Sequence, residues 1–248
     1  MGFSSYIRRK VNCISIALII CLLALSLSCS STSGEQEEVL AALQKTGEAE
    51  SYRFSQVTSG YSYGDIQEYH SETEVASSDY YHSRVVGNSS ITEFVQAGNE
   101  SYVRINDEEW RECTEGTCGC TVVMIPDSLS FLRYLEVEQM IEKETTVDGT
   151  ECRYYRGEVD VDSWATDKEG ASTGDAIYET PYLDEIRHWQ VNAQLWIDNN
   201  NYIRQIKTDV FYPYTDTITG EREWGSVISV ATYSSFNEDI LITKPVLN

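Results

Sequence analysis

The sequence predicts an α+β protein that is mainly β, with about ten antiparallel strands and two helices inserted among them. Short runs alternate between apolar and polar residues, which is the period of a strand with one buried face. Seventeen tyrosines and only four prolines accompany these runs, a composition that favours pleated strands. Since each strand offers one modestly apolar face, we expect a large curved sheet wrapped around a helix, with a cavity between them.

The first 28 residues have the parts of a secretory signal peptide. Three basic residues at 8–10 precede an apolar run over 11–27, and Cys29 stands just after the expected cut. The segment 25–29 is similar to a bacterial lipobox, although Ser26 occupies the position where leucine is usual. We expect 1–28 to be removed, 29–34 to form a lipidated cysteine and a short tether, and 35–248 to be a single domain. A plain cleaved signal or an uncleaved membrane anchor is the alternative.

The charge of the body excludes polyanionic partners. Residues 1–28 hold three basic residues and no acidic one, so the remaining 15 Lys and Arg against 40 Asp and Glu give a net charge of −25. A surface of this sign is repelled by nucleic acid and by anionic lipid headgroups. We therefore predict that the protein does not bind nucleic acid. From the signal peptide and Cys29 we expect an exported protein, held on the extracytoplasmic face of the cell membrane, and we expect it to be a monomer.

The elements of the first half follow from caps and alternation. Ser33–Gln36 reads as a capping box, and acidic residues behind it suit the first turn of a helix that ends near Gly47. Asn106–Glu109 reads as a hairpin turn. Strands are expected at 52–57, 66–75, 80–86, 91–95, 101–105 and 110–113.

The second half begins with a second helix, which should start at 126–128 and carry Leu129, Phe131, Leu132 and Leu135. A turn at 147–149 opens a strand over 152–161, and the acidic stretch 162–185 is expected to be a long loop. Alternation in 191–197 puts Val191 and Leu195 on one strand face and Trp196 on the other. The remaining strands are expected at 202–212 and 227–236, followed by a short segment at 240–242.

Four cysteines remain in the body, which for an exported domain indicates disulfides. Three pairings are possible, and Cys118 with Cys120 would close a very tight loop. We therefore expect Cys152 to bridge to one member of the cluster. Zinc is the alternative, but the spacing lacks the paired C-x2-C arrangement. The disulfide candidates are Cys113, Cys118, Cys120 and Cys152.

Four segments together resemble the LolA/LolB-like superfamily of bacterial envelope lipoproteins, which includes the LppX/LprG lipid-binding lipoproteins. They are the hairpin 97–105 with Trp110 behind it, the turn and strand 147–155, the hairpin 195–204 and the closing segment 233–245. The resemblance covers roughly residues 38–246, except the insertion 113–120 and the stretch 162–185. It implies a half-barrel around helices that encloses an apolar cavity for acyl chains, and no catalysis.

Aromatic and aliphatic residues are the cavity candidates, with ordinary core packing as the alternative for each of them. The predicted function is a lipid-anchored carrier that binds acyl chains of a lipid or lipoprotein in the cell envelope. A structural or interaction module with a filled cavity is the alternative. The candidate lining residues are Phe54, Phe94, Val103, Trp110, Phe131, Leu132, Leu135 and Trp196.

Catalytic and metal motifs are weak. The segment 170–174 is a literal G-x-S-x-G, with Asp184 and His188 in the order of a hydrolase triad, but no buried strand precedes Ser172. Glu68, His70 and Glu72 share one strand face, as any alternating trio does. We therefore predict no enzyme activity, no metal and no cofactor.

Overall fold

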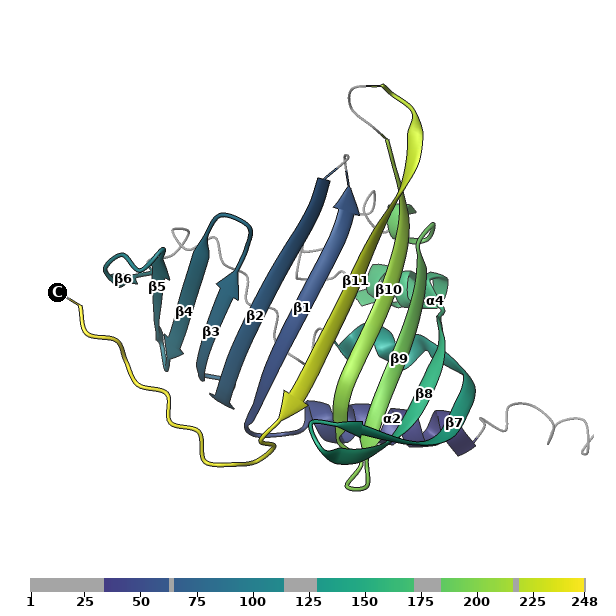
Figure 1. Cartoon of the computed structure of the whole chain (residues 1–248), viewed down its shortest axis with the longest axis horizontal. Coiled ribbons are helices and arrows are strands. Elements are labelled where there is room, and N and C mark those ends of the chain that lie inside the picture. Colours follow the sequence, from purple (N-terminus) through teal and green to yellow (C-terminus); the bar gives the residue numbers. More distant parts are fainter. Residues whose placement is uncertain (1–33, 63–64, 114–128, 172–183, 216–218, 248) are drawn as a thin grey trace, which may run out of the picture.

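The computed structural model describes residues 34–62, 65–113, 129–171, 184–215 and 219–247. In these ranges eleven strands form one antiparallel sheet in the order β6-β5-β4-β3-β2-β1-β11-β10-β9-β8-β7 (Figure 1). The predicted mainly β, antiparallel architecture is confirmed. The elements are α2 (Gly34–Gly47), β1 (Tyr52–Ser62), β2 (Asp65–Ser77), β3 (Tyr80–Val86), β4 (Ile91–Ala97), β5 (Glu100–Ile105), β6 (Arg111–Glu112), the 3-10 helix η1 (Phe131–Tyr134), β7 (Leu135–Val147), β8 (Thr150–Val159), α4 (Val161–Ala171), β9 (Gln190–Asp198), β10 (Ile203–Thr215) and β11 (Arg222–Ser234).

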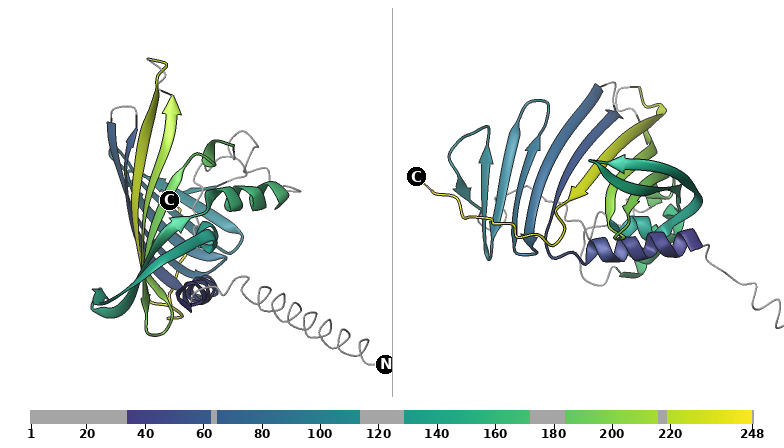
Figure 2. Two further views of the ribbon diagram at one scale, coloured as in Figure 1. Left: turned by 90° about the vertical axis from the view of Figure 1, so that its right-hand side faces the viewer. Right: turned by 60° about the horizontal axis from the view of Figure 1, so that its bottom comes forward.

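The helices lie on one face of the sheet. Figure 2 shows α2 and α4 on the same side of the strands, with the β7–β8 end of the sheet curling around α2. We call this side the helix-side face; on β1 and β9 it carries Phe54, Ala193 and Leu195, which belong to or pack against the core. The opposite side is called the charged face, for the residues described below.

The core fills the space between α2 and the curled half of the sheet. Val39, Ala42 and Leu43 recur at the three- and four-residue spacing of one helix face and are buried. They share a cluster with Leu195 and Ile197 of β9. Each large aliphatic side chain buried in this way contributes roughly 1.5–3 kcal/mol to folding.

Side-chain hydrogen bonds fix α2 at both ends. The Gln36 side chain donates to Leu135 O at 2.7 Å and accepts from Val137 N at 2.9 Å, so it is bonded to the backbone at the start of edge strand β7. At the other end, Thr46 Oγ1 accepts from Ile203 N at 3.0 Å. In the middle, Glu38 pairs with Arg153 of β8. Together these contacts fix the position of α2 relative to the curled strands.

Two regions depart from the expectations. In the described part of the second predicted helix, residues 129–130 are helical and η1 follows them, but Leu135 already begins β7, a strand that alternation did not reveal. The stretch 162–185 is not a long loop throughout, because α4 begins it; Asp160 Oδ1 accepts from Ser163 N at 3.0 Å and caps that helix. The starting residues 126–128 and the stretch 172–183 lie outside the described residues.

The predicted bridge to Cys152 is wrong. Cys113 is disulfide-bonded, whereas Cys152 is a buried free thiol. Cys113 directly follows β6, at one edge of the sheet, and Cys152 lies on β8, next to the other edge. A disulfide needs Cα atoms within about 7 Å, which excludes this pair. Cys118 and Cys120 lie outside the described residues.

The structure describes the C-terminal tail but not the first 33 residues. Residues 1–33, with the predicted signal peptide and Cys29, lie outside the described residues. Within the part of the chain that is described, no helix has the length and apolar character to cross a membrane. At the other end the segment 240–242 adds no strand; the tail runs past the ends of β2 to β5 (Figure 1), and Lys244 there meets Glu100.

Candidate functional site

Three of the predicted lining residues lie in one row across five strands. Phe54 of β1 is paired with Thr73 of β2, and Thr73 with Ser83 of β3. Ser83 is paired in turn with Phe94 of β4, and Phe94 with Val103 of β5. Paired residues of antiparallel strands point to the same side, so the whole row is on the helix-side face.

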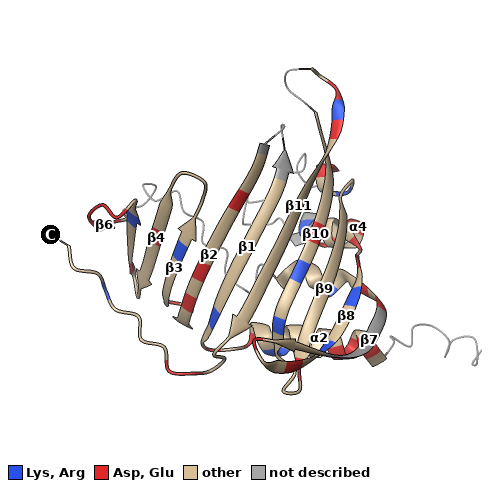
Figure 3. Ribbon diagram, in the orientation of Figure 1, with Lys and Arg blue, Asp and Glu red and all other residues tan. Residues whose placement is uncertain are grey.

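The helix-side face is uncharged over most of the sheet. Over the stretches of β1–β5 and β9–β11 given below, none of the described residues that point to this side is Asp, Glu, Lys, Arg or His. Beyond them, Glu223 near the start of β11 is paired with Tyr214 and points to this side. Figure 3 shows that charged residues occur along most of the strands. The strand register places those of the stretches below on the charged face. The uncharged positions are every second residue in 52–60, 67–75, 81–85, 92–96, 101–105, 191–197, 206–212 and 225–233.

Ionisation does not disturb this neutrality. Tyr81 stacks on Phe94 with ring centroids 5.6 Å apart. Burial raises the pKa of the Tyr81 phenol above its ordinary value, because a phenolate is poorly solvated there. Its hydroxyl therefore stays protonated at neutral pH, and this part of the face remains a neutral surface.

The other predicted lining residues divide between core and charged face. Leu132 and Leu135 are fully enclosed in the core, and Phe131 packs against it. Trp196 is paired with Gln205 and lies on the charged face, where its ring centroid is 5.0 Å from that of Tyr154. Trp110 lies there too, since the Arg104 guanidinium covers its ring at 4.9 Å. The structure therefore brings six of the eight residues to the helix side and separates the two tryptophans from them.

The charged face carries cross-strand ion pairs. Glu93 of β4 is placed between Arg84 of β3 and Arg104 of β5, at 3.6 Å from Arg84 Nε and 2.7 Å from Arg104 Nε. Arg53 pairs with Glu74 at 2.7 Å. Pairs as exposed as Arg53 and Glu74 contribute about 0–1 kcal/mol each, so they set the character of the face more than its stability.

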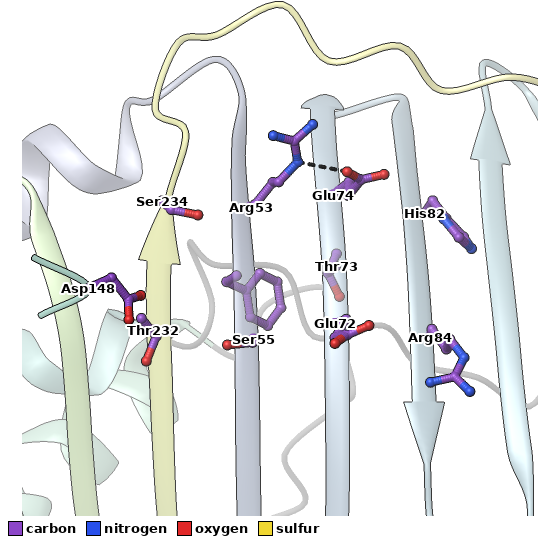
Figure 4. Close-up of a pocket in the computed structure, with 11 residues that line it drawn as sticks. Arg53, Ser55, Glu72, Thr73, Glu74, His82, Arg84, Asp148, Thr232 and Ser234 are labelled. Carbon is purple, nitrogen blue, oxygen red and sulfur yellow. Dashed lines mark hydrogen bonds and ion pairs between the residues drawn. The ribbon is translucent and has the colours of Figure 1, made fainter.

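An open, polar hollow of about 330 Å³ lies on the charged face (Figure 4). Asp148, in the turn between β7 and β8, reaches it from beside Thr232. Of the trio considered for a metal, only Glu72 lines it, and the described residues hold no group of three metal-ligating side chains. The apolar cavity expected from the sequence stays a prediction. The lining residues are Arg53, Phe54, Ser55, Glu72, Thr73, Glu74, His82, Arg84, Asp148, Thr232 and Ser234.

The helix-side face can bind by desolvation and hydrogen bonding. Its phenylalanine, tyrosine and valine side chains present apolar surface, and its hydroxyls and amides present neutral donors and acceptors. Ser172 of the G-x-S-x-G motif lies outside the described residues. The signal that could have found this face is the alternation itself, read together with the absence of charge at every second position.

No protein-family model matches the chain, and no curated protein matches it in sequence. Among solved structures, the chain is similar to LprF from Mycobacterium bovis, with 11% identity, a TM-score of 0.48, and coverage of 87% of this chain and 99% of that one.

Two further structures are similar. A LolA superfamily protein from Nitrosomonas europaea has 12% identity and a TM-score of 0.30, covering 83% of this chain and 97% of that one. A putative outer membrane lipoprotein-sorting protein domain from Vibrio parahaemolyticus has 6% identity and a TM-score of 0.25, covering 80% and 89%. The likeness concerns the fold, and it assigns no ligand to this chain.

Proposed function

We propose that the protein is an extracytoplasmic lipoprotein, anchored in the cell membrane through Cys29, that carries a lipid or a lipoprotein in the cell envelope. It binds the ligand's acyl chains against the helix-side face. The observation that supports this is the segregation of charge: over the stretches given above the helix-side face of β1–β5 and β9–β11 is uncharged, and the ion pairs within these strands lie on the other side. Phe54, Phe94 and Val103 are the proposed contact residues.

Binding by desolvation needs no catalytic group. Each methylene removed from water contributes about 0.8 kcal/mol, so about ten buried methylenes contribute roughly 8 kcal/mol before the cost of immobilising the chain. A charged side chain in the contact surface would oppose this, because it would lose its hydration. The neutral face meets this requirement.

The anchor would keep the binding face near its source of ligand. The tether of residues 30–34 spans at most about 3.5 Å per residue, so α2 would start within roughly 20 Å of Cys29. A body of net charge −25 has no electrostatic reason to stay at an anionic surface. Intact mass analysis of the membrane-bound protein tests the anchor. We expect a chain that starts at Cys29 and carries acyl chains, and an unacylated Cys29 would contradict it.

Solvent extraction tests the carrier function. The purified full-length protein is extracted with organic solvent, which removes non-covalent lipid and leaves acyl chains that are bonded to the cysteine. We expect about one lipid molecule per chain in the organic phase, identified by mass spectrometry. A protein that releases no lipid, and takes none up afterwards, would contradict the proposal.

One observation favours the second candidate, an envelope interaction module with a filled interior. Leu132 and Leu135 occupy the space between α2 and the curled strands, and both are buried. Ligand must therefore bind toward β1–β5, away from this packed end. The extraction experiment decides between the two candidates, because a filled module yields no lipid.

A further inference from the structure

We infer that the polar group of the ligand that lies against the helix-side face is uncharged, and that the ligand's acyl chains point toward α2 while this polar group points toward the end of β1 at Ser62. The inference rests on the proposed function and specifies its ligand. It comes from a change in chemistry along the strands of the neutral face.

The neutral face is apolar at the α2 end. Tyr52 and Phe54 of β1 point into it, beside Val75 of β2 and Tyr233 of β11. Tyr52, Val75 and Tyr233 are buried, and Phe54 packs against the same core. Because the core already covers Tyr52, Val75 and Tyr233, the hydrocarbon contacts next to this end come from the partly buried Phe54 and Tyr81.

The same face becomes polar and more open further along the strands. The next inward-pointing residues of β1 are Gln56 and Thr58, which are half-buried. Thr58 is paired with Tyr69 of β2, whose side chain is 45% exposed, and with Ser229 of β11. The exposed end therefore combines access to water with neutral hydrogen-bonding groups, which suits the polar end of an amphiphile.

Three of these side chains form a hydrogen-bonded cluster, which we call the amide–hydroxyl cluster: Gln56, Thr58 and Ser229. Gln56 Nε2 donates to Thr58 Oγ1 at 3.1 Å and to Ser229 Oγ at 2.7 Å, and the two hydroxyls are 3.2 Å apart. One hydroxyl hydrogen is left over, and Gln56 Oε1 accepts no hydrogen bond from the described residues. The cluster can thus both donate to and accept from a hydroxyl or an ester.

A phosphate has no counter-ion at this place. The residues that point to the helix-side face over 52–60, 67–75 and 225–233 are uncharged, and the cations of these strands, such as Arg53, point to the charged face. An anion moved from water into a neutral site without a partner loses its hydration at high cost. The cluster should therefore accept a neutral polar group and reject an anionic one.

Two probes that differ only in a phosphate test this inference: dioleoylglycerol and dioleoyl phosphatidic acid. Their binding to the full-length protein is measured by displacement of a fluorescent diacylglycerol. We expect dioleoylglycerol to bind at least about tenfold more tightly. Thr58→Lys puts a cation in place of one of the cluster's hydroxyls and should reduce this preference at least about tenfold. Ser59→Lys makes the same charge change on the opposite face and should leave the preference unchanged.

The outcomes separate this inference from the proposed function. Equal binding of the two probes, or tighter binding of phosphatidic acid, overturns the inference and leaves the carrier function standing. An equal effect of Thr58→Lys and Ser59→Lys also overturns it, because the preference then comes from the net charge of the body. If neither probe binds, the carrier function itself fails.

Discussion

Thr46 Oγ1 accepts a hydrogen bond from Ile203 N at 3.0 Å, and both residues are completely buried. Thr46 is in the last turn of α2, and Ile203 is the first residue of β10. The backbone N–H at this point is therefore satisfied by a helix side chain. This contact joins the helix to the strands that curl around it.

Thr46→Val should destabilise the protein by about 1–3 kcal/mol. Valine keeps the shape of the side chain, but Ile203 N loses its buried acceptor and no water can replace it. Urea unfolding measures the change. Thr46→Ser, which retains the hydroxyl, should recover most of the loss; if serine and valine cost the same, the hydrogen bond is not the cause.

Gly157→Ala should cost more than about 3 kcal/mol of stability. A Cβ at this position of β8 would come within 1.9 Å of Glu136 O, a backbone atom of the neighbouring strand β7. The sheet edge cannot adjust without breaking the ladder. Gly47→Ala is the matched control, since a Cβ there meets nothing within 4 Å, and a value within about 1 kcal/mol of the wild type is expected. A folded, stable Gly157→Ala protein would contradict the close approach.

Val85→Glu should lower the amount of bound lipid by about tenfold, whereas Val86→Glu should not. The two valines are neighbours in β3 and are both half-buried, but Val85 is paired with Ser71 on the helix-side face and Val86 with His70 on the charged face. A glutamate on the neutral face would lose hydration when ligand binds. Solvent extraction of both variants provides the comparison, and equal losses would show that position on the sheet does not matter.

The C-terminal tail should be released by acid. The Lys244 ammonium bonds to the Glu100 carboxylate and holds the pKa of that carboxyl below its ordinary value, with the Tyr102 hydroxyl adding to the effect. In the same contact the pKa of Lys244 is raised. The contact is therefore complete between the ordinary pKa of glutamate and that of lysine; it is lost as the pH falls through the lowered pKa of Glu100, or rises through the raised pKa of Lys244.

Hydrogen exchange of residues 238–247 as a function of pH measures this release. Lys244→Ala should give fast exchange in the tail at neutral pH. Lys207→Ala removes a lysine that pairs with Asp209 elsewhere in the sheet and should not affect the tail. Slow exchange in the Lys244→Ala protein at neutral pH would show that other contacts hold the tail.

Cys152 should resist alkylation in the folded protein. Burial raises the pKa of its thiol above the ordinary value, so little of the reactive thiolate forms at pH 8. Mass spectrometry of the peptide containing Cys152 should show alkylation by iodoacetamide at least about tenfold slower in the native than in the unfolded protein. A peptide in which Cys152 is linked to Cys113 would restore the pairing that the sheet order excludes.

Local patterns correctly predicted much of the fold. The capping box located α2, and alternation located β1 to β5 and β9 to β11, because caps and strand periodicity depend only on neighbours in the chain. The turn at Asp148 and Gly149, with φ values of 49° and 80°, was also visible in the sequence. Of the candidate lining residues, Phe54, Phe94 and Val103 share the helix-side face, and their role in binding stays a prediction.

Other features depend on pairing between distant segments. β7 and α4 escaped prediction because β7 is specified by its ladder with β8, and α4 by a cap at Asp160 and by packing of Ala165 against Ile186. Trp196 was named as a lining residue because it is aromatic. It is paired with Gln205 of β10 and lies on the face away from the helices.

The amino-acid sequence alone thus establishes which residues of a strand share a face, because successive side chains alternate. It does not establish which of the two faces meets α2, nor which strands stand beside each other. Those depend on the register of eleven strands and on where α2 is fixed by contacts such as Thr46 with Ile203, and both are set by contacts between residues far apart in the chain.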